Sequence, residues 1–269
     1  YPVSSPARGI LMSGMYPMNN KVIGNCNSDT APYGVELPET ARCWSDVLKD
    51  KNYRTGYIGK WHLDSPYKPY VDTYNNRGET AWNEWCPPER RHGFDVWVAY
   101  GTYDNHRNPM CWETAAPRDS FFYAHKWGPE YEVDRAIEFL SEQKKSSSPF
   151  ALVVSMNPPH TGYDLVPDKY KEIYKHLNVE SLCKNRPDIP AKGTEMGDYF
   201  RNNIRDYYAC MTGVDENVGR LIEELKRLKL FDNTIVVFTS DHGICMGAHH
   251  SAGKDIYYEE SMKVPMIIS

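Results

Sequence analysis

The chain has 269 residues, of which 41% are hydrophobic and 25% are charged. These are ordinary values for a globular protein, and they exclude the disordered and fibrous classes. The formal net charge is −5 and no dense run of Lys or Arg occurs, which argues against a nucleic-acid partner. No apolar run reaches the length of a membrane span, so we expect no membrane-spanning helix.

The seven cysteines are scattered along the chain, with no C-x-x-C pair. This pattern excludes a zinc ribbon and a dense disulfide scaffold. An odd number also leaves at least one cysteine without a partner in the same chain. The redox compartment therefore does not follow from the cysteines.

The stretch VSSPARGILMSG at residues 3–14 predicts a short helix. Ser4 can cap this helix, Pro6 suits its first turn, and Gly14 can end it. Ser4 and Arg8 are four residues apart, so a helix places both side chains on one side. A hydroxyl, a guanidinium and the positive helix end would then converge, which favours an oxyanion. Taken alone, the stretch is better explained as an ordinary cap beside a solvated arginine.

Three units of helix, short connection and apolar strand follow along the chain. Their apolar residues recur at helical spacing in each helix and form continuous runs in the last two strands. Continuous apolar strands are expected to be covered on both faces. Such units predict an α/β fold, a three-layer α/β/α sandwich with a mostly parallel central sheet. The helices and strands are predicted, in chain order, within 36–50 and 53–63, at about 129–145 and 150–160, and at about 199–229 and 234–243.

Two long stretches, 64–128 and 161–198, lack this periodicity. The first is rich in Trp, Tyr, Pro, Asn and Arg. We predict that it passes over the mouth of the sheet and contributes one strand at 94–100. The second is predicted to be a similar insertion. Long loops of this kind are commonly functional, and the aromatic content favours ordered walls that face a substrate.

Polar residues gather where the predicted strands end. Lys60 and His62 follow the first strand, His160 follows the second, and Asp241 and His242 follow the third. Ligands of open α/β sheets bind beyond the carboxyl ends of the strands, so this concentration predicts a site. Each cluster alone has a structural explanation, such as a satisfied core histidine, a proline turn or an Asx turn. Their combination is hard to assign to chance.

The order of S-x-P-x-R, GKWHL, NPPH and TSDHG, followed by GK and YEES-x-x-VP, resembles the sulfatase family of the alkaline-phosphatase superfamily. The resemblance runs from Ser4 to Ser269. It implies an alkaline-phosphatase-like fold and the hydrolysis of sulfate esters, with a sulfated carbohydrate as the expected substrate. Ser4 matches the position that a maturase oxidises to formylglycine in serine-type members, and Ala7 replaces the commoner serine of the motif.

The resemblance also implies that cationic and histidine side chains handle the sulfate. Arg8 and Lys60 would hold the modified group and a sulfate oxygen. His62 would take the proton when sulfate is expelled. His160 and Lys254 would bind the sulfate, and one of them would assist departure of the alcohol. Taken alone, Lys254 is equally a solvated lysine before a helix.

A divalent cation, Ca²⁺ or Mg²⁺, is implied as well, with Asp241, His242 and the modified Ser4 as ligands. His242 stands where many relatives have Asn. His249 matches a recurrent histidine near the site and is predicted to bind substrate. The family places a pair of acidic ligands on a strand ahead of the nucleophile, and this sequence has no such segment. We therefore expect residues 1–269 to be a catalytic domain truncated at both ends that binds metal poorly.

Two other functions remain open at this point. A phosphodiesterase or phosphonate monoester hydrolase shares the nucleophile and the metal framework, and a catalytically silent protein would keep the anion pocket to bind sulfated glycans. The expected partners are a sulfated small molecule or glycan and a formylglycine-generating maturase. The resemblance also implies a bacterial periplasmic or exported protein.

Overall fold

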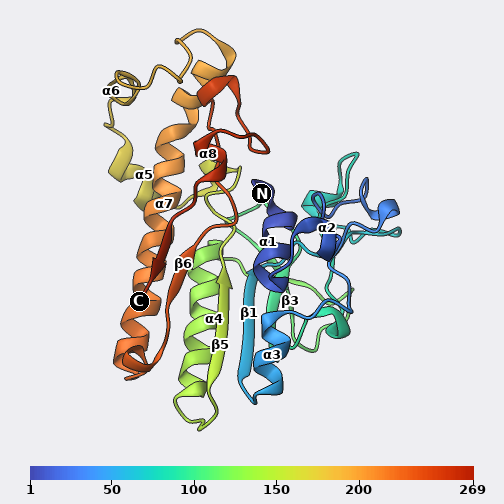
Figure 1. The fold of residues 1–269 in the computed structure, drawn as a ribbon. Coiled ribbons are helices and arrows are strands. Elements are labelled where there is room, and N and C mark those ends of the chain that lie inside the picture. Colours follow the sequence, from blue (N-terminus) through green and yellow to red (C-terminus); the bar gives the residue numbers. More distant parts are fainter.

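A mixed five-stranded sheet, in the order β4-β3-β2-β1-β5, forms the centre of the fold (Figure 1). The computed structural model describes all 269 residues. β1 pairs in parallel with both β2 and β5, whereas β3 runs antiparallel to β2 and to β4. The predicted α/β class is confirmed. The strands are β1 (Arg54–Lys60), β2 (Val96–Tyr100), β3 (Met110–Glu113), β4 (Phe122–Tyr123) and β5 (Phe150–Ser155).

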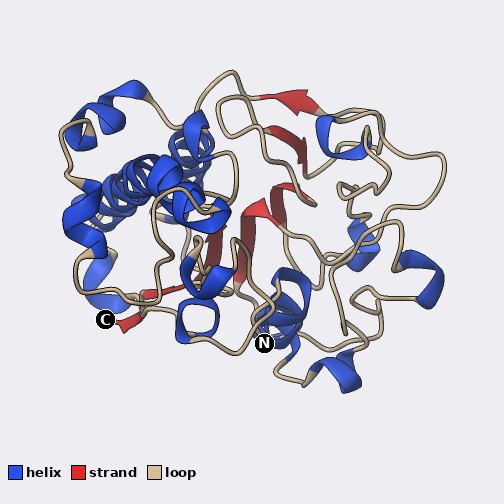
Figure 2. Cartoon of the chain, turned by 90° about the horizontal axis from the view of Figure 1, so that it is seen from above, coloured by secondary structure: helices blue, strands red, loops and turns tan.

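Helices cover both faces of this sheet, which gives three layers (Figures 1 and 2). Side chains alternate along β1, so Tyr57 packs with Trp97 on the face toward α1 and α3, whereas Ile58 packs with Ala136 on the face toward α4. The long helix α7 packs on α4. No helix combines the length and apolarity that crossing a bilayer requires. The helices are α1 (Ser4–Ser13), α2 (Pro17–Asn20), α3 (Trp44–Asp50), α4 (Gly128–Gln143), α5 (Asp168–Tyr174), α6 (Val179–Cys183), α7 (Glu195–Arg227) and α8 (Glu259–Met262).

The third predicted strand lies outside the central sheet. It is β6 (Val237–Thr239), which pairs only with β7 (Met266–Ile268), in antiparallel orientation. Its neighbourhood is exposed, with Val237 at 53% and Ile267 at 60%. The expectation that this strand is covered on both faces is therefore wrong for these residues, and β5 is only half-buried along its length.

The helix predicted within 36–50 is shorter than that range and begins at Trp44. Its start is fixed by a capping box, in which the backbone N–H of Cys43 donates to Asp46 Oδ2 at 2.8 Å. The other two helices are found as α4 and α7. α7 begins four residues before the predicted 199, because the Thr194 side chain accepts a hydrogen bond from the N–H of Gly197 and caps it there.

The two aperiodic stretches differ from the prediction in their content. Residues 64–128 hold β2, β3 and β4, so part of this stretch extends the central sheet. The single predicted strand at 94–100 is confirmed as β2. Residues 161–198 hold α5 and α6, which contact α7.

Candidate active site

Three parallel strands deliver polar residues to one edge of the sheet. β1 ends at Lys60, β5 ends at Ser155, and both are followed by loops at the same edge as the end of β2. The start of α1 lies at this edge as well (Figure 1). Ser4 is the first residue of α1 and Val3 is its N-cap, so the predicted capping role of Ser4 is wrong, whereas Gly14 ends the helix at a φ of 67° as predicted.

The Ser4 hydroxyl is held by groups from the other end of the chain. Ser4 Oγ lies 2.9 Å from His242 Nε2, and Lys254 Nζ donates to both at 3.3 Å and 2.9 Å respectively. His242 Nδ1 lies 2.7 Å from the carbonyl oxygen of Gly243, so Nδ1 carries the proton and Nε2 is the acceptor. Burial lowers the pKa of His242 to about 4 and keeps the ring neutral. Ser4, His242 and Lys254 therefore form one contact group.

Arg8 connects this group to the sheet. Its Nε and one terminal nitrogen lie 3.0 and 2.9 Å from Asp241 Oδ2, and the other terminal nitrogen donates to Lys60 O and Ser155 Oγ, both at 2.8 Å. Burial opposes ionisation of Asp241, but Arg8 together with the other neighbouring groups, among them Lys60 and Lys254, outweighs it and holds the pKa of the carboxyl below its usual range. The predicted convergence of Ser4 and Arg8 is found. Arg8 contacts Asp241, and Ser4 contacts the next residue, His242.

Lys60 and His160 belong to a second set of contacts at the same edge. Lys60 Nζ donates to Asn157 Oδ1 at 3.1 Å, and Asn157 Nδ2 donates to Asp104 Oδ1 at 3.1 Å. The same Asp104 oxygen lies 2.9 Å from His160 Nδ1. Burial and the charge of Arg8 lower the pKa of Lys60 to about 7, and burial and Lys60 lower the pKa of His160 to about 4.

Two predicted residues lie outside these contacts. His62 is buried and its Nε2 lies 3.1 Å from the carbonyl oxygen of Cys26, whereas its Nδ1 has no hydrogen-bond partner. His249 pairs with Glu260 at 3.1 Å and stacks on the Tyr258 ring at 3.7 Å. Neither histidine hydrogen-bonds the Ser4 group, so their roles in proton transfer and substrate binding stay predictions.

The structure adds residues that the sequence reading did not single out. They are Ser155, Asn157 and Asp104. Asn157 is the first residue of the NPPH motif, and Asp104 follows the end of β2. Asp104 follows β2, which is parallel to β1, so the rule that ligands bind beyond parallel strand ends applies to this residue as well.

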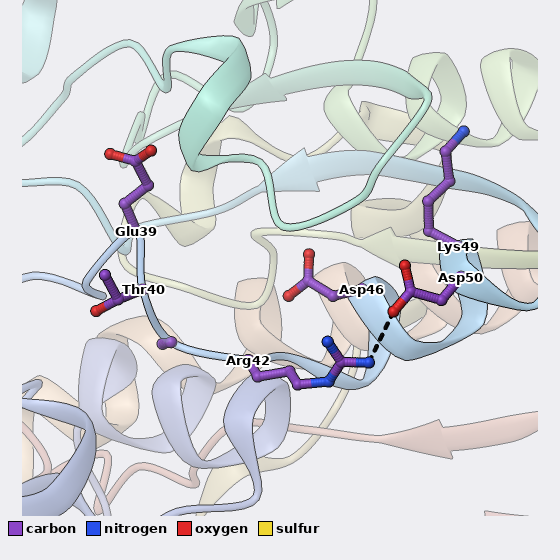
Figure 3. Close-up of a pocket in the computed structure, with 7 residues that line it drawn as sticks. Glu39, Thr40, Arg42, Asp46, Lys49 and Asp50 are labelled. Atoms are coloured by element: carbon purple, nitrogen blue, oxygen red, sulfur yellow. Dashed lines mark hydrogen bonds and ion pairs between the residues drawn. The ribbon is translucent and has the colours of Figure 1, made fainter.

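A surface depression of about 420 Å³ lies elsewhere, at the start of α3 (Figure 3). Charged side chains surround it, and Arg42 donates to Asp50 across it at 2.7 Å. It shares no residue with the contacts around Ser4 and offers one apolar lining residue, Ala41. Its location and lining do not suggest a substrate pocket.

The metal implied by the motifs is not matched by a complete set of donors here. Ca²⁺ requires about six to eight oxygen ligands, and Asp241 and Ser4 are the oxygen-bearing side chains of the predicted set. Arg8 takes one Asp241 oxygen, the N–H of His242 takes the other at 3.0 Å, and the Lys254 ammonium lies against Ser4. These residues alone do not form a Ca²⁺ site.

A buried hydroxyl thus lies beside cationic side chains at the carboxyl edge of a three-layer α/β fold. The family model described as Sulfatase matches residues 1–269, and the chain belongs to the sulfatase family. Its structural neighbours share the alkaline-phosphatase-like fold.

Two curated relatives and one solved structure are similar in sequence to this chain. The chain is 36% identical to the endo-4-O-sulfatase of Bacteroides thetaiotaomicron, over 99% of this chain and 52% of the relative. It is 32% identical to the ulvan-active sulfatase of Formosa agariphila, over 99% of this chain and 47% of the relative. A solved structure of the Bacteroides fragilis protein named yidJ is 78% identical, with a TM-score of 0.99, over 100% of this chain and 58% of that one. The chain spans about half the length of the curated relatives.

Proposed function

We propose that the protein hydrolyses sulfate esters of a carbohydrate, with position 4 as the nucleophile. The observation that carries the proposal is the contact group around Ser4, in which Lys254 Nζ and His242 Nε2 both lie within 3.3 Å of the buried hydroxyl. Membership of the sulfatase family supports the same reaction.

The environment of Ser4 suits an oxygen nucleophile that is oxidised to formylglycine. When hydrated, that group supplies two hydroxyls on one carbon, one for attack on sulfur and one whose proton loss restores the aldehyde. Lys254 is a hydrogen-bond donor to an oxygen at this carbon, and the neutral His242 is an acceptor. A plain serine hydroxyl is a weak nucleophile, which is why activation is required.

The remaining residues bind and orient the anion. Lys254 lies against Ser4, and Lys60 lies at the same edge of the sheet. Both place positive charge where a sulfate would lie. His160 is connected to Lys60 through Asp104 and Asn157 and can hydrogen-bond the substrate through Nε2. Arg8 donates hydrogen bonds to Asp241 Oδ2, the Lys60 carbonyl oxygen and Ser155 Oγ. Its role is therefore to hold Asp241 and the end of β1 in place.

The divalent cation of the family is part of this proposal. Asp241 and His242 are its proposed ligands, together with the oxygen at position 4 and further oxygen ligands from outside this donor set. Asp241 suits the role because its carboxylate is ionised and lies beside Ser4's partner His242.

The substrate class follows from the relatives. An endo-4-O-sulfatase and an ulvan-active sulfatase support a sulfated glycan over a small sulfate ester. A large charged glycan does not cross a bilayer unaided, so we place the protein in the bacterial periplasm or outside the cell. A formylglycine-generating maturase is then its processing partner.

The experiment is a screen of sulfated mono- and disaccharides with the full-length protein, produced together with a serine-type maturase. Mass spectrometry should show that residue 4 has lost two hydrogens, and sulfate release should require that loss. Faster turnover of matched phosphate diesters would instead indicate a phosphodiesterase. Binding of sulfated glycans without turnover, by protein with modified residue 4, would indicate a silent binding protein.

A further inference from the structure

Asp104 hydrogen-bonds to residues of two other segments, 157–160 and the one that holds Asn75, at the edge of the site. Its Oδ1 lies 2.9 Å from His160 Nδ1 and 3.1 Å from Asn157 Nδ2. Its Oδ2 accepts a hydrogen bond from Asn75 Nδ2 at 2.9 Å, and Asn75 Oδ1 accepts the backbone N–H of Asp104 at 3.0 Å. Both carboxylate oxygens are therefore held by partners in or directly behind the site.

We propose that Asp104 is a positioning residue for sulfate ester hydrolysis, orienting His160 directly and Lys60 through Asn157. The inference rests on the function proposed above. Asp104 Oδ1 and Thr161 Oγ1 lie 2.9 and 3.1 Å from His160 Nδ1, so this nitrogen carries the proton in the neutral ring. Nε2 then holds the lone pair, makes no hydrogen bond within the chain, and is left for the substrate.

The carboxylate also balances the charge that catalysis places on His160. The position-4 hydroxyl forms the bond to sulfur and releases its proton to solvent, the bond from sulfur to the alcohol oxygen breaks, and the alcohol oxygen then needs a proton. A His160 that has taken a proton from solvent at Nε2 gives this proton to the alcohol oxygen and returns to the neutral form. During this cycle Asp104 faces the imidazolium at 2.9 Å, as a buried carboxylate does in other acid–histidine pairs.

The same oxygen orders the nearby lysine. Asn157 donates to Asp104 with its amide nitrogen, so its amide oxygen is presented to Lys60 Nζ at 3.1 Å. Reversing the Asn157 amide would leave both contacts unmade. The Tyr103 carbonyl oxygen accepts the same Asn157 nitrogen at 2.9 Å, so Asp104 orients His160 directly and shares with Tyr103 the orientation of the amide that holds Lys60.

The test is Asp104→Asn in the full-length, matured protein, assayed on two substrates. 4-Nitrophenyl sulfate has a leaving group that needs no proton, whereas a sulfated disaccharide releases a poor one. In the variant, an amide nitrogen faces either Asn75 Nδ2 or the His160 and Asn157 donors, so the hydrogen-bond pattern is lost. We expect kcat to fall about 100-fold or more on the disaccharide and less than about 10-fold on the aryl ester.

The matched control is Asn75→Ala, which removes a bond to the same carboxylate without touching His160. It should change the ratio of the two rates less than about 3-fold. Asp104→Asn combined with His160→Gln should cost less than the two single losses multiplied together, since the part of the loss that acts through His160 is then counted only once. Equal losses on both substrates, or fully additive losses in the double variant, would overturn the proposal.

One further measurement does not depend on activity. Nitrogen-15 spectra of the histidine rings, assigned with His160→Gln, should show protonated Nδ1 in the parent and a changed tautomer population in Asp104→Asn. An unchanged tautomer would contradict the positioning role even if the enzyme is a sulfatase. Absence of sulfate release by the parent protein would defeat the proposed function, while the ring spectra would still decide the role of Asp104.

Discussion

Buried and half-buried charges of both signs meet at the Ser4 end of the sheet. Arg8, Lys60 and Lys254 are cationic side chains of this region, and Asp241 and Asp104 are the carboxylates that contact its residues. With all five ionised, positive charge exceeds negative charge, which favours an anionic ligand. The lowered pKa of Lys60, about 7, has burial as its first cause and the neighbouring cations as its second, and a bound anion would raise it again.

Ser4→Ala should abolish sulfate release and leave the fold intact. The lost hydroxyl contacts His242 and Lys254, which still contact each other at 2.9 Å, so we expect a loss of only about 1 kcal/mol in the free energy of unfolding. Ser5→Ala is the matched control, because Ser5 Oγ is equally buried but accepts the backbone N–H of Cys26. Kinetics and thermal unfolding of both variants check this, and residual turnover in Ser4→Ala above a few per cent would contradict it.

Asp241 gives the prediction about metal. In the full-length protein, chelation should remove activity and Ca²⁺ or Mg²⁺ should restore it. Asp241→Ala should mimic chelation in a metal titration, and Asp241→Asn should be milder because an amide oxygen can still coordinate. Activity that survives both chelators and Asp241→Ala would show that Asp241 serves only as the ion-pair partner of Arg8.

At the scale of elements, β1 is the strand on which the site depends, because Lys60 ends it and both its neighbours are parallel. Gly59 lies one residue before Lys60 at a φ of 103°, and a Cβ there would lie 2.2 Å from the Ser155 carbonyl oxygen. That distance is far shorter than a van der Waals contact. A glycine is thus required where β1 passes β5.

Gly59→Ala should therefore destabilise the protein by about 3 kcal/mol or more, through backbone strain and displacement of β5. The comparison is Gly14→Ala at the end of α1, which also has a positive φ, 67°, but would meet nothing within 4 Å. It should cost only about 1 kcal/mol. Denaturant unfolding measures both, and similar losses at the two positions would refute the packing argument.

The contact between α4 and β2 predicts a pH dependence. Glu132 Oε1 accepts the Tyr100 hydroxyl at 2.9 Å and Oε2 has no partner. Burial raises the pKa of Glu132 from 4.5 to about 8. Between these values the folded protein holds a proton that the unfolded chain has lost, so this group's contribution to stability falls as pH rises, by at most about 1.4 kcal/mol per pH unit.

Glu132→Gln should remove that slope. The free energy of unfolding of the variant minus that of the parent should be larger at pH 8 than at pH 5. Any cost of the amide that does not depend on pH cancels in this comparison. Denaturant unfolding at the two pH values is the measurement. An equal difference in unfolding free energy between variant and parent at pH 5 and pH 8 would mean that Glu132 is ionised in the folded protein.

Elements with strong local signals were the ones that the sequence predicted well. α4 and α7 have long apolar periodicity, and β2 and β5 are apolar runs bounded by polar residues. The start of α3 and the pairing of β6 were missed. A capping box decides the first, and hydrogen bonding to a strand about thirty residues later decides the second, so neither follows from periodicity.

For the molecule as a whole, the rule that ligands bind beyond parallel strand ends applies to Lys60 and His160, which follow β1 and β5, but not to Asp241, because β6 lies outside the central sheet. Lys60, His160, Asp241 and Lys254 were predicted from that rule and from the resemblance, and the structure brings them to the same end of the sheet. The partners of each side chain were beyond prediction. Asp104, for example, lies 56 residues before His160, and the two come together because β2 and β5 both pair in parallel with β1.

The most direct measurement of the central claim is sulfate release from a sulfated disaccharide by full-length protein whose residue 4 has been characterised by mass spectrometry. The account predicts that the rate rises in proportion to the fraction of residue 4 that has lost two hydrogens, and that Ser4→Ala is inactive under the same conditions. Full activity from protein that carries only unmodified serine at position 4 would contradict it.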